Sequence, residues 1–283
     1  MIIRAPLVKR SRLNAYDAGK ALSDGWVVNF AVGCTFGCPF CYVDSIHRLY
    51  NPYRLSREFL KEDWGSYFLI PSNLEDAIRE TPWFRWSGVE VLMSSTHDPY
   101  LPQLYYPKPY PRLILEHALP QGVRFRILTR SLLVLKDVDL LVRYRGQVMV
   151  MYSIPTLDEG LSRIIEPRVP PPSARLLALR RLRETGLRVG VIIAPIIPRP
   201  DLDRDLSRLM GELAGIGVDV VYGEMLHVRG LNMERLKKLG VNVAVNRVVD
   251  EEIGRLFNGL LGKYGLKGTY WYEFKSREVE AYR

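Results

Sequence analysis

Short apolar runs and helical patterns alternate along most of the chain. The apolar runs are rich in β-branched residues, and each is followed by a segment with apolar residues at helical spacing. We predict strands in six ranges: 26–32, 89–95, 123–129, 147–154, 188–196 and 218–226.

The intervening segments predict helices that begin and end at recognisable signals. Ser72 or Asn73 provides an N-cap for the first helix, and glycines follow several of the others. The predicted ranges are 73–81, 111–119, 133–144, 173–186, 201–217, 231–240 and 248–265.

Strands that alternate with helices of this length form βαβ units around a parallel sheet. Right-handed crossovers curl about six such units into an open barrel. We therefore expect an α/β fold, a partial (β/α)6 TIM-like barrel. In parallel α/β barrels functional residues lie at the C-terminal ends of the strands, so the residues after each strand are candidates.

The chain is long enough to bury a sizeable core, with 283 residues of which 47% are hydrophobic. We expect one domain over 1–283, with a core of about 26–230 and a helical C-terminal extension of about 231–283. No run of about 18 apolar residues predicts a membrane span, and the N-terminus has no signal-peptide pattern.

The chain is basic, with a formal net charge of +9. An excess of arginine and lysine favours an anionic partner such as a nucleic acid. The alternative is that these residues solvate the helix faces, and their spread along the chain is compatible with both interpretations.

All three cysteines of the chain lie in "GCTFGCPFCY", at Cys34, Cys38 and Cys41. Scattered core thiols and a disulfide framework do not produce this cluster. One alternative is a Cys3His zinc site completed by His47. The other is an iron–sulfur cluster, in which three thiolates leave one iron of a [4Fe–4S] cube without a cysteine ligand.

The spacing Cys-x3-Cys-x2-Cys, followed by the aromatic Tyr42, resembles the radical S-adenosylmethionine (SAM) superfamily. The resemblance implies a [4Fe–4S] cluster on the three cysteines, with SAM chelated by the open iron. It further implies reductive cleavage of SAM, with an electron donor such as flavodoxin or ferredoxin, to a 5′-deoxyadenosyl radical that abstracts hydrogen from a substrate. An oxygen-sensitive cluster favours a reducing cytoplasm.

Polar residues follow the second predicted strand in "SSTHDPY". We expect Ser95 and Thr96 to hydrogen-bond SAM, together with Tyr42 beside the last cysteine. Asp98 and Tyr100 are candidate catalytic residues. The alternatives are a turn aspartate before proline and a packing aromatic.

The later strands also end in polar residues. Arg130 is a candidate for pairing with the SAM carboxylate, and Ser153 is a further polar ligand. After the last predicted strand, Glu224 and His227 are candidate catalytic residues at the barrel mouth, with Arg229 close by.

The strings "THDPYLP", "ILTRSLLVLKDVDLL" and "YSIPTLDEGLSRIIEPRVPPPSAR" resemble the branch related to spore photoproduct lyase. In that branch a basic residue, usually lysine, and a serine bind SAM; these correspond to Arg130 and Ser153. The lyase uses a further cysteine as hydrogen donor, which this chain lacks.

The resemblance leaves the substrate open. A nucleic acid is the first candidate, and a peptide, a protein side chain or a small molecule is the next. A zinc-bearing nucleic-acid-binding protein without catalysis is the alternative function. The segment 269–283 is aromatic and charged, and either closes the barrel or meets a partner.

Overall fold

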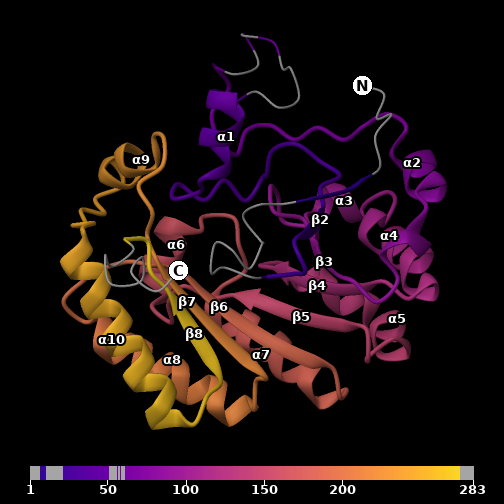
Figure 1. Cartoon of the computed structure of the whole chain (residues 1–283). Helices are drawn as coiled ribbons and strands as arrows, with labels where there is room; N and C mark the ends of the chain where they lie inside the picture. Colours follow the sequence, from indigo (N-terminus) through magenta and orange to yellow (C-terminus); the bar gives the residue numbers. More distant parts are fainter. Residues whose placement is uncertain (1–6, 11–21, 51–55, 57, 59–60, 275–283) are drawn as a thin grey trace, which may run out of the picture.

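The computed structural model describes residues 7–10, 22–50, 56, 58 and 61–274 of the chain. Within them lies one eight-stranded sheet in the order β1 to β8 (Figure 1). β1 runs antiparallel to β2, and every other neighbouring pair is parallel. The strands are β1 Val8–Arg10, β2 Trp26–Val28, β3 Glu90–Met93, β4 Arg124–Thr129, β5 Val148–Ser153, β6 Arg188–Ile196, β7 Val220–Met225 and β8 Gly268–Trp271.

Helices connect these strands. The α-helices are α1 Val43–Tyr50, α2 Leu74–Glu80, α3 Pro102–Tyr105, α4 Tyr110–Ala118, α5 Val138–Arg143, α6 Glu159–Ile165, α7 Pro172–Glu184, α8 Leu202–Ile216, α9 Asn232–Lys238 and α10 Arg247–Tyr264. The described residues also form the 3-10 helices η4 Trp83–Trp86, η5 Leu119–Gln121 and η6 Leu132–Asp137. Within the described residues, no helix combines the length and the apolar character needed to cross a bilayer.

The predicted partial (β/α)6 barrel is confirmed, since β2 to β7 are parallel neighbours in chain order. The sheet stays open because β1 and β8 stand at opposite ends of that order. Short elements were not predicted, among them β1, β8 and α1. β8 extends the sheet beyond the predicted core limit near residue 230, so the C-terminal segment is not purely helical.

The predicted helix 133–144 divides into η6 and α5 at Asp137. The Asp137 carboxylate is buried and accepts hydrogen bonds from the hydroxyls of Tyr100 and Tyr105, at 2.9 and 2.7 Å. This junction therefore ties the helix to the segment after β3.

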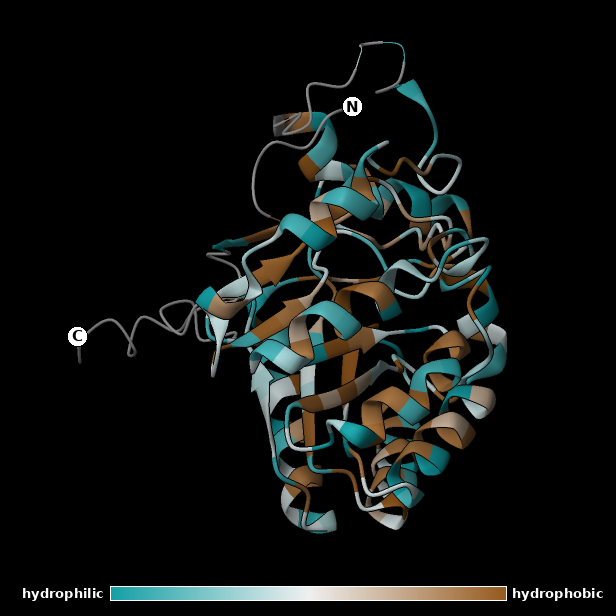
Figure 2. Ribbon diagram, turned by 90° about the vertical axis from the view of Figure 1, so that its right-hand side faces the viewer, coloured by the Kyte–Doolittle hydropathy of each residue, from teal (hydrophilic) through white to brown (hydrophobic). Residues whose placement is uncertain are grey.

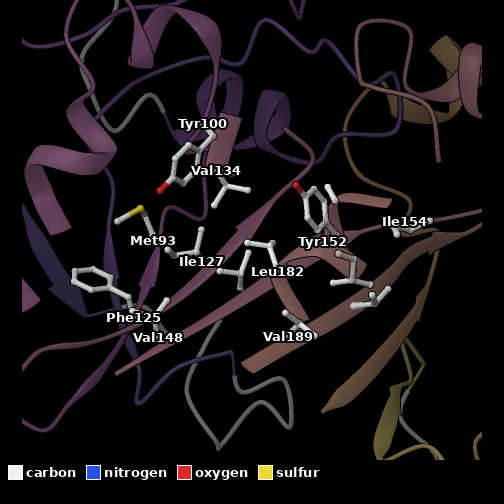
Figure 3. Packing of buried hydrophobic residues seen from close by; sticks show 14 of the residues in the cluster. Met93, Tyr100, Phe125, Ile127, Val134, Val148, Tyr152, Ile154, Leu182 and Val189 are labelled. Atoms are coloured by element: carbon white, nitrogen blue, oxygen red, sulfur yellow. The ribbon is translucent and has the colours of Figure 1, made fainter. Parts of the chain in front are cut away.

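The main core lies between the sheet and the outer helices. Alternate residues of β4 and β5 point into it, including Ile127, Val148 and Val150, because side chains alternate across a strand (Figure 3). Full burial of such a side chain stabilises the fold by about 1.5–3 kcal/mol. Figure 2 shows apolar residues concentrated along the strands.

The opposite face of the sheet carries a second, smaller apolar cluster. Its buried members are Met149, Met151, Ile192 and Trp271, and Tyr222 stacks on Trp271 with ring centroids 4.7 Å apart. This face is therefore packed with side chains, and these include the ion pair of Arg126 and Glu90 at 2.8 Å. The candidate residues lie beyond it at the C-terminal ends of the strands.

Candidate functional site

The cysteine loop connects β2 to α1 and rests on the segment 64–67. Gly33 and Gly37 have positive φ angles of 86° and 61°, a conformation that side chains disfavour. A Cβ atom on Gly33 would lie 2.4 Å from the Tyr67 carbonyl oxygen, and one on Gly37 would lie 3.2 Å from the Gly65 Cα. Both glycines therefore allow a close backbone contact.

Hydrogen bonds hold the curvature of this loop. The Gly37 N–H donates to the Cys34 carbonyl at 3.2 Å, and the Cys41 N–H donates to the Cys38 carbonyl at 3.0 Å. Arg168 Nη1 donates to the Thr35 carbonyl at 2.9 Å and to the Gly65 carbonyl at 2.6 Å. One guanidinium group thus fastens the loop to the segment beneath it.

The three cysteines differ in exposure: Cys38 is buried, and Cys34 and Cys41 are half-buried. Cys38 is 7% exposed, and burial raises the pKa of Cys34 to about 12, that of Cys41 to about 11, and that of Cys38 well above its ordinary value. Thiolates in such surroundings require a strong positive charge, which bound iron supplies. Three soft thiolate donors on one glycine-bearing loop fit an iron–sulfur cluster.

The arrangement does not support the Cys3His zinc site. Among the described residues, no group of three or more His, Cys, Asp or Glu side chains is gathered closely enough to hold a single metal ion. His47 lies buried in α1, where its Nδ1 is 3.1 Å from the Tyr67 hydroxyl and its ring is 6.1 Å from that of Trp64. A [4Fe–4S] cube does not require several protein ligands around one ion, because each thiolate binds a different iron.

Tyr42 connects the cysteine loop to the end of β3. Its hydroxyl donates to the Ser95 carbonyl at 2.8 Å, and its side chain is 39% exposed. Asn29 Oδ1 accepts the Ser95 N–H at 2.9 Å, which holds β2 and β3 together at this edge. Thr96 is half-buried, with its hydroxyl 3.4 Å from His97 Nδ1.

Asp98 links the end of β3 to the end of β4. Its carboxylate accepts the Thr129 hydroxyl at 2.7 Å and the backbone N–H groups of Arg130 and Tyr100 at 2.6 and 2.9 Å. Burial raises the pKa of Asp98, and these donors partly oppose that rise. Both carboxylate oxygens are thus engaged by the chain itself.

Tyr100 does not lie at the strand edge, where we expected a catalytic candidate. It is buried in the outer layer beside Met93 and Val134, and its hydroxyl donates to Asp137 (Figure 3). The reason is the turn at Asp98, which directs the following residues away from the barrel mouth and into the core.

Arg130 lies next to the cysteine loop. Its Nε donates to Glu166 Oε1 at 2.7 Å, and its guanidinium carbon is 5.6 Å from the Phe40 ring centroid. The carboxylate of Glu166 raises the pKa of Arg130 against the effect of burial. Ser153, which is buried, donates through its hydroxyl to the Ala194 carbonyl at 3.2 Å, and Arg130 Nη2 reaches the same oxygen at 3.3 Å. The structure therefore brings these two predicted SAM ligands together.

Glu224 and His227 meet at the end of β7. His227 Nε2 is 2.8 Å from Glu224 Oε1, and His227 Nδ1 is 2.5 Å from Glu273 Oε2. Arg229 Nη2 contacts Glu273 Oε1 at 2.8 Å. Both ring nitrogens thus face carboxylates, and the second carboxylate is itself fixed by a guanidinium group.

Glu273 was not singled out by the sequence. It follows β8, whose pairing with β7 places Trp271 opposite Glu224. The aromatic and charged composition of 269–283 was the one signal that pointed to this segment.

Comparison with known sequences identifies the family. A family model described as the radical SAM superfamily matches residues 28–213. An uncharacterized protein of Acidianus two-tailed virus is 54% identical over 279 residues, which cover 96% of this chain and 91% of that protein. An uncharacterized protein of Methanocaldococcus jannaschii is 31% identical and covers 72% of this chain and 71% of its own length.

Solved structures share the fold at low sequence identity. Spore photoproduct lyase complexed with dinucleoside spore photoproduct aligns with a TM-score of 0.67 at 16% identity, over 92% of this chain and 80% of that one. SuiB of Streptococcus suis, bound to the precursor peptide SuiA, aligns with a TM-score of 0.61 at 14% identity, over 90% and 50% of the two chains. The family match, together with these folds, shows that the chain belongs to the radical SAM superfamily, whose members use SAM and a [4Fe–4S] cluster.

Proposed function

We propose that this protein is a radical SAM enzyme that binds a [4Fe–4S] cluster through Cys34, Cys38 and Cys41. The observation that carries the proposal is that the chain's only thiols lie on one loop, beside a guanidinium group at the C-terminal edge of the sheet. When bound, the cluster supplies the electron that cleaves SAM, and the 5′-deoxyadenosyl radical then abstracts hydrogen from the substrate.

The side chains around the loop have separate tasks in this proposal. Arg130 pairs with the carboxylate of SAM, and Ser153 orients the same ligand. One side of the proposed SAM site is formed by Tyr42, Ser95 and Thr96. The hydrogen bond from the Tyr42 hydroxyl to the Ser95 carbonyl holds the end of β3 against the cysteine loop. Asp98 acts through Arg130, because it accepts the backbone N–H of that residue.

The substrate in this proposal binds above the strand ends, since side chains fill the inner face of the sheet. A nucleic acid remains the first candidate. The net charge of +9 favours an anionic partner, and the similarly folded lyase has been solved with a dinucleoside. A peptide is the second candidate, because the similarly folded SuiB has been solved with one.

The physiological setting is part of the proposal. An oxygen-sensitive cluster requires a reducing compartment such as the cytoplasm and a one-electron donor such as flavodoxin or ferredoxin. We propose a single domain over 1–283, because the described residues before and after position 230 contribute strands to the same sheet.

Anaerobic purification followed by iron analysis tests the proposal. We expect a brown protein with an absorbance shoulder near roughly 400 nm, typical of cysteine-ligated clusters. With dithionite and SAM it should release 5′-deoxyadenosine. A colourless protein with stoichiometric zinc would instead support the nucleic-acid-binding alternative.

A second assay separates the substrate classes. Single-stranded and duplex oligonucleotides and a peptide mixture would each be added to the reduced enzyme. The true class should raise the rate of 5′-deoxyadenosine release above the rate without substrate, and a deuterated substrate should transfer deuterium to that product. No stimulation by oligonucleotides would reject the nucleic-acid candidate.

A further inference from the structure

We propose that Arg175 is a positioning residue that holds both proposed SAM ligands in place, Ser153 directly and Arg130 through Glu166. This inference rests on the proposed function of those two ligands. It concerns a helix residue that does not itself face the barrel mouth.

Arg175 belongs to α7 in the outer layer, yet its guanidinium group reaches the ends of the strands. Its side chain is 0% exposed. Nη1 donates to the Ser153 carbonyl at 2.5 Å, and Nη2 donates to Glu166 Oε2 at 2.5 Å. A planar guanidinium fixes these two bonds in one geometry, which a lysine ammonium does not do.

Glu166 transmits this constraint to Arg130. It lies at the C-cap of α6, and its carboxylate is fully buried. Oε2 accepts from Arg175, and Oε1 accepts Arg130 Nε at 2.7 Å. Since each oxygen binds a different guanidinium, a rotation of Glu166 away from Arg175 would also misdirect Arg130.

The same arrangement joins two strands at one point. Arg175 holds the backbone of Ser153 on β5, while Arg130 is held at the end of β4. The Ser153 hydroxyl and Arg130 Nη2 then share the Ala194 carbonyl on β6. The buried cation therefore sets the relative position of two groups that come from different strands.

Stability alone does not explain these buried charges. Buried ion pairs can often be replaced by well-packed apolar residues without loss of stability, because desolvation offsets their attraction. In addition, Arg175 Nε has no hydrogen-bond partner among the described residues. An advantage in ligand binding explains the buried charges. Arg130, already ordered by Glu166, loses less rotamer freedom when it binds the carboxylate of SAM.

The decisive experiment is the double variant Glu166→Met and Arg175→Met, which removes the buried pair but keeps its volume apolar. We expect iron content and the melting temperature of the protein without cluster to stay close to those of the wild type. The SAM dissociation constant, measured by equilibrium dialysis on the cluster-loaded protein without reductant, should rise about tenfold, or ~1.4 kcal/mol. An unchanged dissociation constant would overturn the proposal.

A conservative variant keeps the test decisive if the double variant does not fold. Arg175→Lys retains the charge but holds only one of the two acceptors. It should weaken SAM binding severalfold and raise the KM for SAM more than it lowers kcat. SAM binding equal to that of the wild type, with iron content preserved, would reject the positioning role.

Asp137→Asn provides the matched control. Asp137 is also a buried carboxylate that pairs with an arginine, Arg112, but it lies in the outer layer. This variant should lower the melting temperature and leave SAM affinity unchanged. A wild-type protein that takes up iron but does not bind SAM would contradict the proposed function itself, whereas equal binding by wild type and the Arg175 variants contradicts the positioning role alone.

Discussion

The two sides of the strand edge differ in which charged group is shared. On the cofactor edge, formed by the ends of β3 to β6, two guanidinium groups share the single carboxylate of Glu166. On the carboxylate edge, formed by the ends of β7 and β8, Glu224 and Glu273 share the imidazole of His227. The first arrangement suits an anionic ligand group, and the second suits a ligand group that donates hydrogen bonds.

The two edges also differ in their relation to the family. The residues of the cofactor edge lie within the segment 28–213 that matches the superfamily, and the carboxylate edge lies beyond it. We therefore expect the cofactor edge to determine SAM binding and the carboxylate edge to determine turnover of the substrate.

The largest effect is expected from the cysteine loop, on which both edges depend. Cys38→Ala should abolish both the brown chromophore and 5′-deoxyadenosine formation, because two thiolates do not retain the cluster. Iron analysis and chromatography measure the two losses. Thr35→Ala, in the same loop, removes only a hydrogen bond to Gln103 and should keep both properties. SAM cleavage that survives in Cys38→Ala would contradict the assignment of the cluster.

Arg130→Met should weaken SAM binding about 30-fold or more, as is typical when one member of a buried charge pair is truncated. The cluster should remain, because Arg130 is not a ligand. Equilibrium dialysis measures the affinity, and absorbance measures the cluster. Unchanged affinity for SAM would show that Arg130 on the cofactor edge does not determine SAM binding.

Glu224→Gln and Glu273→Gln test the carboxylate edge. Turnover of the substrate found by the oligonucleotide and peptide assays should fall about 10- to 100-fold, since hydrogen bonds to charged groups contribute ~1.5–3 kcal/mol. SAM cleavage without substrate should not change. Glu234→Gln, an exposed carboxylate on the nearby α9, should leave both rates intact. A parallel loss of SAM affinity in the Glu224 variant would mean that the two edges do not act separately.

The smallest effect, taken per pH unit, is a pH dependence of stability at the end of β3. Burial lowers the pKa of His97 to about 3, below the value of about 6.5 in an unfolded chain. Between these values the unfolded state takes up a proton that the folded state does not. The free energy of unfolding should therefore fall as the pH decreases through this window, by up to ~1.4 kcal/mol per pH unit.

His97→Leu should make this dependence shallower in denaturant titrations at several pH values. Some slope should remain, because burial also lowers the pKa of His47. A His97 variant with the full wild-type slope would show that another group is responsible.

Much of this fold could be predicted from local patterns. The apolar runs of β2 to β7 identify a parallel sheet, and the C-terminal edge of such a sheet then brings Arg130 and Ser153 together. Tertiary contacts, which no local pattern predicts, decide the surroundings of two candidate residues. Tyr100 follows a turn that leads into the core, and the carboxylate of Asp98 is engaged by donors from β4.

Other residues carry no local signal. Arg175 lies in "PSARLLALRRLRE" of α7, where a sequence pattern predicts a solvated helix face. Glu273 depends on the four-residue strand β8, which is too short for alternation to identify. In both cases the function of the residue follows from a partner that is distant in the sequence.

The short strand β8 has a dynamic consequence. It is the last strand of the described sheet, so its ladder there is supported by β7 on one side. Terminal strands fray at lower free energy than interior ones, and their amide protons exchange sooner with deuterated solvent. Fraying at 268–271 would carry Glu273 away from His227 while β4 and β5 stay paired. The carboxylate edge would then open and close independently of the cofactor edge.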